Sequence, residues 1–267
     1  MPEGDTIHKA ARRLRDALAG RRVVRFDLRR DARGVRTPEP GTTIATVEAR
    51  GKHLLISFDD GAVLHTHMQM TGAWHVYERD ERWRRPAHRA RVIIEVDDGT
   101  EAVCFDAPVV ELTRAGRSAA PTRAKRALDR LGPDLATDDI DLDAVMQNLD
   151  RIDPTTEVGV ALLDQRVAAG IGNVFKSEVL WRERVDPFTQ LRAVDAETRR
   201  RLYERAHEFI VANLKTKRRV TFQGGYAVYR KARRPCPRCR TPIRTKKQGD
   251  PPRSTYWCPA CQPVREA

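Results

Sequence analysis

The stretch His53-Leu-Leu-Ile-Ser-Phe-Asp-Asp-Gly-Ala-Val-Leu-His-Thr-His67 decides how the first part of the chain folds. Its segments 53–58 and 62–67 are strand-like and flank Asp59-Asp60-Gly61. An Asp-Gly pair supplies the positive φ angle that a tight turn between two strands requires. The stretch therefore predicts a β-hairpin.

The same pattern occurs a second time. Residues 91–96 and 101–105 flank Asp97-Asp98-Gly99 and predict another hairpin. Further strands are expected near 23–28 and 44–48, after a helix that ends near Gly20. Residues 1–115 are thus predicted to form a β-sandwich preceded by one helix.

The chain changes character after this region. Residues 115–125 are small, polar and basic without strand or helix periodicity, which indicates a linker. The chain beyond is predicted to be helical, with segments at 157–165, 173–184 and 195–217. The last has one apolar stripe, and a glycine-containing turn joins the first two, as in helix-turn-helix modules. The predicted fold class is α+β.

Four of the five cysteines form two pairs near the C-terminus, Cys236-Pro-Arg-Cys239 and Cys258-Pro-Ala-Cys261. The spacing C-x2-C-x18-C-x2-C lets two knuckles place four thiolates on one tetrahedral zinc ion. A site closed by four cysteines has no open position, so we predict one structural Zn²⁺ that takes no part in catalysis. The segment between the pairs is basic and suits phosphates.

The composition indicates the kind of partner. The chain has 50 Lys and Arg against 37 Asp and Glu, a net charge of +13. This balance favours a polyanionic partner, although a GC-rich coding sequence would equally explain the excess of Arg. No run of about 18 apolar residues and no apolar N-terminal signal region occurs. We therefore expect no membrane span, no secretion by the usual route and a cytoplasmic location.

The first residues, Met1-Pro2-Glu3-Gly4-Asp5, suggest covalent amine catalysis. Removal of Met1 would leave the secondary amine of Pro2, which can attack an electrophilic carbon and form an iminium. An α-amino group titrates near pH 7.7 to 8.0 in a model peptide, about where a nucleophile is needed. Glu3 could donate a proton to the leaving or ring-opening oxygen. The alternative is a plain helix start with Asp5 as N-cap, followed by an apolar stripe at Ile7, Ala11, Leu14 and Leu18.

Several other residues have both a functional and a structural interpretation. Gly170-Ile-Gly-Asn173 opens a helix, where an anion is favoured, but Asn173 could equally cap that helix. Lys52 at a strand start could contact a phosphate or simply be solvated. His65 and His67 share one strand face, yet a third metal ligand is not evident in register, so we expect polar strand positions. The Arg-rich run 82–91 is expected to be a solvated loop.

Taken together, the motifs resemble one family. They are Pro2-Glu3-Gly4, Gly51-Lys52-His53-Leu54-Leu55, Met68-Gln-Met-Thr-Gly72, Gly170-Ile-Gly-Asn173, Val228-Tyr-Arg230 and Arg253-Ser-Thr-Tyr-Trp-Cys-Pro-Ala-Cys-Gln262. In this order and spacing, which cover essentially the whole chain, they resemble the formamidopyrimidine-DNA glycosylase and endonuclease VIII family.

The resemblance implies a β-sandwich, a helix-two-turn-helix domain and a zinc finger. The corresponding division of this chain is 1–115 for the helix and sandwich, 116–135 for a linker, 136–225 for the helix-two-turn-helix domain and 226–267 for the zinc finger. It also implies a bifunctional glycosylase and lyase that acts on damaged DNA. We expect a monomer, not bound to membranes, in the bacterial cytoplasm and on the nucleoid.

The resemblance also implies roles for single residues. Pro2 would attack C1′ of a flipped-out damaged nucleotide, and Glu3 would protonate the sugar ring oxygen. The iminium would then undergo β,δ-elimination. Lys52, Asn173 and Arg253 match phosphate-contacting positions, and Gln69 and Met70 match residues that wedge into the base stack. A wedge offsets part of the few kcal/mol that base flipping costs.

The branch of the family is suggested by two departures. Gly4 replaces the leucine that usual formamidopyrimidine enzymes carry in Pro-Glu-Leu. Residues 105–114 read Phe-Asp-Ala-Pro-Val-Val-Glu-Leu-Thr-Arg in place of a Pro-Arg-Arg-Phe-Gly loop. Both are similar to endonuclease VIII, which acts mainly on oxidised pyrimidines. Two alternatives stay open at this point: a zinc-containing DNA-binding protein without catalysis, and the purine-lesion branch of the same family.

Overall fold

The structure is a computed structural model that describes residues 2–29, 36–114 and 123–264. The chain forms two compact units, Met1–Asp129 and Arg130–Ala267, each with its own hydrophobic core. Of the predicted linker 116–135, residues 116–122 lie outside the described ranges, and helix α2 (Arg123–Leu128) follows them. Among the described residues, no helix is both long and apolar enough to span a bilayer.

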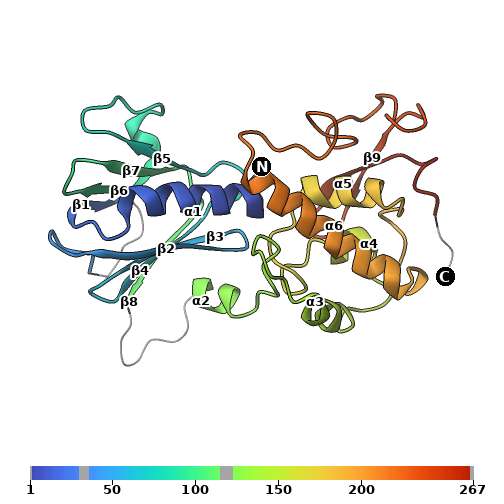
Figure 1. The fold of residues 1–267 in the computed structure, drawn as a ribbon, viewed down its shortest axis with the longest axis horizontal. Helices are drawn as coiled ribbons and strands as arrows, with labels where there is room; N and C mark the ends of the chain where they lie inside the picture. Colours follow the sequence, from blue (N-terminus) through green and yellow to red (C-terminus); the bar gives the residue numbers. More distant parts are fainter. Residues whose placement is uncertain (1, 30–35, 115–122, 265–267) are drawn as a thin grey trace. The chain divides into compact units, whose positions relative to one another are not determined.

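The first unit is a sandwich of two antiparallel sheets, with helix α1 (Gly4–Leu18) packed against β2, β3 and β5 (Figure 1). The strand orders are β1-β6-β7-β5 and β2-β3-β4-β8. The strands are β1 (Val23–Leu28), β2 (Ile44–Arg50), β3 (His53–Phe58), β4 (Ala62–His67), β5 (Ala73–Tyr77), β6 (Ala90–Val96), β7 (Glu101–Phe105) and β8 (Val109–Arg114). The sandwich and both predicted hairpins are confirmed, and β5 and β8 are additional strands.

Helix α1 begins earlier than a cap at Asp5 would allow. Its predicted apolar stripe is confirmed, because all four side chains are buried against the sheets. The N-cap, however, is Glu3, which is extended and accepts hydrogen bonds from the backbone N–H groups of Thr6 and Ile7. The expectation that Asp5 is the N-cap is therefore wrong. Asp5 is buried in the first turn, 3.8 Å from the Lys9 ammonium.

The second unit contains four helices and a small hairpin among its described residues. They are α3 (Leu142–Leu149), α4 (Val158–Ala161), α5 (Asn173–Arg182), α6 (Ala196–Leu214), β9 (Arg244–Gln248) and β10 (Arg253–Trp257). Short 3₁₀ turns, η1 (Ala87–Arg89) and η2 (Leu191–Ala193), lie in the first and second units. Helix α4 is shorter than the predicted 157–165. The chain after it forms a loop in which the Gln165 side chain donates to the Leu163 and Ile171 carbonyls and accepts from Gly170 N.

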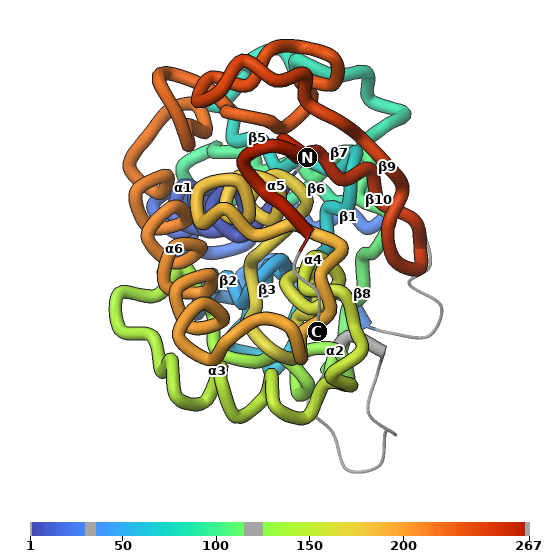
Figure 2. The backbone as a smooth tube through the Cα atoms, turned by 90° about the vertical axis from the view of Figure 1, so that its right-hand side faces the viewer, coloured from blue at the N-terminus to red at the C-terminus, as the bar shows by residue number. Residues whose placement is uncertain are grey.

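Helix α5 is enclosed on all sides. Every residue from Asn173 to Trp181 is buried, including Lys176 and Glu178. The Glu178 carboxylate accepts four hydrogen bonds of 2.6–2.8 Å, from the Thr221 hydroxyl and the backbone N–H groups of 227–229. Figure 2 shows the dark red end of the chain passing beside the yellow α5. Buried polar groups on one helix thus hold segments that follow much later in the sequence.

We expect Glu178→Gln to lower the free energy of unfolding by about 3 kcal/mol. An amide keeps one acceptor oxygen but turns an NH₂ group toward backbone N–H donors, which leaves buried groups unpaired. Urea unfolding followed by tryptophan fluorescence measures the change. The matched control is Glu197→Gln, which removes the exposed partner of Arg201 on α6 and should change stability by less than about 1 kcal/mol. Equal stabilities for the two variants would contradict this assignment to Glu178.

Candidate functional site

The four paired cysteines converge at the end of the second unit. Their sulfur atoms all lie within 4.8 Å of one another, with Cys239 Sγ 3.4 Å from Cys258 Sγ and Cys236 Sγ 3.9 Å from Cys261 Sγ. A tetrahedral zinc ion with Zn–S bonds of about 2.3 Å would separate its sulfurs by about 3.8 Å. Four thiolates at this spacing fit one zinc ion and close its coordination sphere, so the ion is structural.

The surroundings of the cysteines favour thiolates around a cation. Hydrogen bonds from Thr241 lower the pKa of Cys239 to about 6. Burial and the neighbouring thiols raise the pKa of Cys261 to about 12. A divalent cation reverses the second effect because it stabilises coordinating thiolates. The indole N–H of Trp181, on α5, donates to Cys236 Sγ at 3.4 Å. Such contacts orient the coordinating sulfur.

Asn173 is bonded to the strand that begins with Arg253 in the second unit. Asn173 is the first residue of α5, whose N-cap is Gly172, so the alternative that Asn173 caps the helix is wrong. Its amide Nδ2 donates to the Ser254 carbonyl at 2.6 Å. Arg253, the residue before Ser254, opens β10 and is exposed. Asn173 Oδ1 is buried and has no hydrogen-bond partner among the described residues. One amide therefore ties the start of α5 to the strand that presents the Arg253 guanidinium.

Pro2 and Glu3 lie at the start of α1 in the first unit. Pro2 is partly exposed, whereas the Glu3 side chain is completely buried. Proline fits this position because it precedes the N-cap and has no N–H to leave unpaired. The carboxyl group of Glu3 is thus enclosed directly beside Pro2 in the sequence.

Strand register places Lys52 and Met70 at the same edge of the sandwich. Lys52 lies in the turn between β2 and β3, and its neighbour His53 pairs with His67, the last residue of β4. Gln69 and Met70 follow β4 directly, and both are exposed, with Met70 58% accessible. Within the described ranges, Met70 is one of three exposed large apolar side chains, with Val24 and Val264. This edge therefore presents a cation and an apolar side chain together.

A histidine cluster lies beside Lys52. His53 Nδ1 is 2.8 Å from His65 Nε2, and the His53 and His67 rings are in edge-to-face contact with centroids 4.8 Å apart. A third histidine lies in register with His65 and His67, because the hairpin pairs His53 with His67. The register of the two strands on either side of Asp59-Asp60-Gly61 would have predicted the pairing of His53 with His67 from the sequence. Even so, the cysteines are the only group of three or more potential ligands suitably arranged for a metal within the described ranges.

The three imidazoles are neutral near pH 7. Burial lowers the pKa of His53 to about 3 and those of His65 and His67 to about 4. The neighbouring histidines and the Lys52 ammonium contribute to the lowered pKa values of His53 and His67. A neutral cluster lets Lys52 keep its charge without repulsion from its neighbours.

This cluster predicts a pH-dependent stability of the first unit. Unfolded histidines bind protons near pH 6.5, whereas the folded cluster binds them near 3 to 4. The free energy of unfolding should be highest above pH 6.5 and fall as the pH drops toward 4, by up to about 1.4 kcal/mol per pH unit per histidine. Urea unfolding at four pH values tests this. His53→Gln with His65→Gln should flatten the dependence, whereas the exposed His88→Gln should leave it unchanged; equal slopes in all three proteins would contradict the assignment.

Sequence reasoning missed the buried polar residues that hold β9 and β10 against α5 in the second unit. Glu178, Lys176 and Gln248 were not singled out, yet Lys176 Nζ donates to the Thr255 hydroxyl at 2.6 Å and Gln248 contacts both. The available signal was α5 itself, where charged residues occur among apolar ones without a polar face of their own. A helix without a polar face that still carries charges must satisfy them internally.

Known protein families match both units of the chain, with their domains in the same order along the sequence. Three family models match: the formamidopyrimidine-DNA glycosylase N-terminal domain at residues 1–108, the formamidopyrimidine-DNA glycosylase H2TH domain at 131–223, and the zinc finger found in FPG and IleRS at 234–264. The three matches follow the order of sandwich, helices and cysteine hairpin.

Individual relatives are similar over nearly their full length. A Streptomyces coelicolor protein named "Probable endonuclease 8 2" is 43% identical over 98% of this chain and 94% of its own. A Mycolicibacterium smegmatis protein named "DNA-(apurinic or apyrimidinic site) lyase Nei2" is 34% identical over 98% of this chain and 99% of its own length. The crystal structure of MutM (FPG) from Thermus thermophilus superposes with a TM-score of 0.78 at 27% identity, covering 99% of this chain and 100% of that one.

Proposed function

The chain belongs to the formamidopyrimidine-DNA glycosylase and endonuclease VIII family, and from this premise we propose that it excises oxidised pyrimidines from DNA with Pro2 as the nucleophile. Family membership makes it a DNA glycosylase and apurinic/apyrimidinic-site lyase of base excision repair, with one structural zinc ion. The division of labour among its residues and the class of lesion are our proposal.

The pair Pro2-Glu3 carries the proposal. After removal of Met1, the Pro2 nitrogen attacks C1′ of the damaged nucleotide and the glycosidic bond breaks. The enclosed Glu3 carboxyl group protonates the ring oxygen O4′ as the sugar opens, which gives an iminium between Pro2 and C1′. Loss of a C2′ proton expels the 3′ phosphate, and δ-elimination expels the 5′ phosphate. A protein that only binds DNA has no use for this pair, which argues against the non-catalytic alternative.

Two cationic side chains and one amide supply contacts to the DNA backbone in this proposal. Lys52 contacts a phosphate from the first unit, and Asn173 and Arg253 contact phosphates from the second. The hydrogen bond from Asn173 to the Ser254 carbonyl supports a shared role, since it sets the position of the Arg253 strand. The net charge of +13 supplies the long-range attraction.

The proposed preference for oxidised pyrimidines rests on the loops that face the base stack. Gln69 and Met70 act as the wedge, and the exposure of Met70 supports this role. The segment after β7 lacks the Pro-Arg-Arg-Phe-Gly loop of the formamidopyrimidine branch. The names of the two relatives described above agree with the endonuclease VIII branch.

Borohydride trapping tests the nucleophile and the lesion class together. We expect the Met-processed protein to form a crosslink at Pro2 with duplexes carrying 5-hydroxyuracil or thymine glycol, and a weaker one with 8-oxoguanine. Pro2→Gly should reduce excision and keep duplex affinity, and Glu3→Gln should lower excision about a hundredfold. Peptide mapping locates the crosslink.

Two matched proteins control this experiment. A chain with a tag on its N-terminus has no free proline amine and should not trap, whereas the same tag on the C-terminus should have no effect. Equal loss of affinity and excision in Pro2→Gly would overturn the nucleophile. Stronger trapping on 8-oxoguanine would assign the chain to the purine-lesion branch.

Arg253 is tested through the salt dependence of binding. Each phosphate contact contributes about −0.9 to the slope of log K against log salt concentration on duplex DNA. We expect Arg253→Ala to weaken binding and make the slope less negative by about one such step. Arg201→Ala, which removes an α6 cation that is already paired with Glu197, is the control. If both variants keep the wild-type slope, Arg253 does not contact a phosphate.

A further inference from the structure

The wedge loop, residues 68–72, is held tightly at both of its ends. Met68 is buried in the core of the sandwich, whereas Met70 points out with 58% of its surface exposed. Gly72 N donates to Met68 O at 2.8 Å, which closes the turn. A Cβ atom at Gly72 would come within 2.8–3.0 Å of the Met68 and Ala107 backbones. Only glycine therefore allows the loop to pack this closely on the segment after β7.

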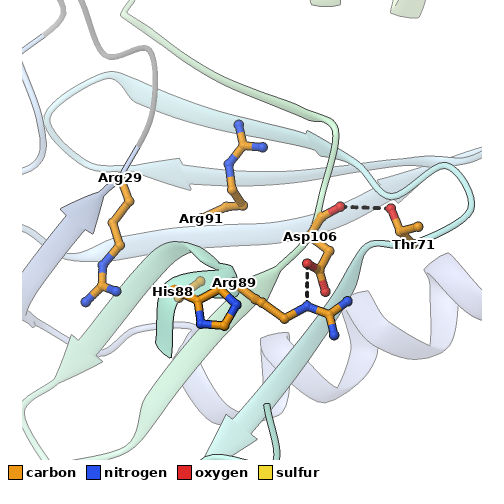
Figure 3. A pocket seen from close by; sticks show the side chains of 7 residues that line it. Arg29, Thr71, His88, Arg89, Arg91 and Asp106 are labelled. Atoms are coloured by element: carbon orange, nitrogen blue, oxygen red, sulfur yellow. Dashed lines mark hydrogen bonds and ion pairs between the residues drawn. The ribbon is translucent and has the colours of Figure 1, made fainter. Parts of the chain in front are cut away.

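Asp106 connects that segment to the wedge loop. Its backbone has φ +52°, a conformation that aspartate and asparagine adopt more readily than most residues. Its carbonyl accepts a 3.0 Å hydrogen bond from the Thr71 hydroxyl (Figure 3). The Arg85 guanidinium donates both to the Thr71 carbonyl at 3.3 Å and to the Asp106 carboxylate at 2.7 Å. Both the main chain and the side chain of Asp106 thus fix Thr71.

A second arginine completes the brace. Arg89, in the 3₁₀ turn η1, donates from Nε to the other carboxylate oxygen at 2.8 Å, and the Asp106 N–H donates back to the Arg89 carbonyl. The hydrogen bond from Arg89, with help from Arg85, lowers the pKa of Asp106. The run 82–91 is therefore not simply the solvated loop that its composition suggests. Trp83, in the same run, packs edge-to-face on Phe105, the residue before Asp106.

We infer that Asp106 is a positioning residue that braces the wedge loop, so that Met70 enters the base stack from a rigid turn. The inference rests on the proposed function, in which Gln69 and Met70 are the wedge. The formamidopyrimidine branch carries its Pro-Arg-Arg-Phe-Gly loop in this part of the chain. Here the same segment binds the wedge loop through Asp106, with two arginines turned back onto its carboxylate.

The physical benefit of the brace is preorganisation. A loop that must be ordered when DNA binds adds the entropy of its own ordering to the cost of opening the stack. The hydrogen bonds of Thr71 fix the residue after Met70, and burial in the core fixes Met68, two residues before Met70. The side chain between them can then enter the stack while the protein backbone stays as it is.

The test compares stack opening with excision in matched variants. A 2-aminopurine base opposite 5-hydroxyuracil gains fluorescence when the stack is opened by the bound protein. We expect Asp106→Asn and Thr71→Val to lose most of this signal and to slow single-turnover excision about tenfold, the same loss that we expect for Met70→Ala. Asparagine tolerates the backbone conformation of Asp106, and valine at position 71 removes only the hydroxyl hydrogen bond. Should Asp106→Asn have a lower melting temperature than the wild type, the result for Thr71→Val decides the test.

Two comparisons decide the outcome. If the brace acts through Met70, then Asp106→Asn combined with Met70→Ala should be no worse than Met70→Ala alone. Asp80→Asn alters an exposed aspartate with φ +64° in another loop of the same unit and should resemble the wild type. Additive losses, or a full fluorescence gain in both Asp106→Asn and Thr71→Val, would overturn the inference. If the wild type itself forms no borohydride crosslink at an abasic site, the proposed function fails instead.

Discussion

The second unit depends on the need to satisfy the polar groups that α5 buries. Asn173, Lys176 and Glu178 lie on one enclosed helix, and each takes a partner from a segment more than 40 residues later. An unpaired buried carboxylate or ammonium would cost several kcal/mol, so these partners are obligatory. The helical core and the zinc hairpin therefore fold as one body. Trp181 extends the same dependence to the zinc site through its hydrogen bond to Cys236.

In the first unit the corresponding constraint is strand register. A shift of one residue would turn every side chain of β3 or β4 to the opposite face. The observed register brings Lys52, the histidine cluster and the loop after β4 to one edge. It also brings the end of β7 next to the start of β5, because Phe105 pairs with Ala73. Asp106 and Thr71 can meet only because both sheets end at this edge.

The parts that were predictable are those governed by local rules. The Asp-Gly turns, the cysteine spacing and the apolar stripes of α1 and α6 need only neighbours in sequence, and the structure has all of them. The failures concern long-range pairing. His53 joined His65 only through cross-strand register, and α5 gave no amphipathic signal because both its apolar and its charged residues are buried. The N-cap of α1 was misplaced because Glu3 caps with its backbone carbonyl, without the side-chain bond that a cap motif advertises.

The residues assigned to DNA share one kind of support. Arg253 opens a strand tied to α5 by Asn173, Met70 sits on a turn tied to Asp106, and Glu3 is fixed by the first turn of α1. In each case the supporting bond has a main-chain group on at least one side, so the support reaches the backbone itself. Flipping a base already costs a few kcal/mol, and any ordering of the protein would add to that cost. A site whose contact groups are fixed beforehand can use its binding energy on the DNA alone.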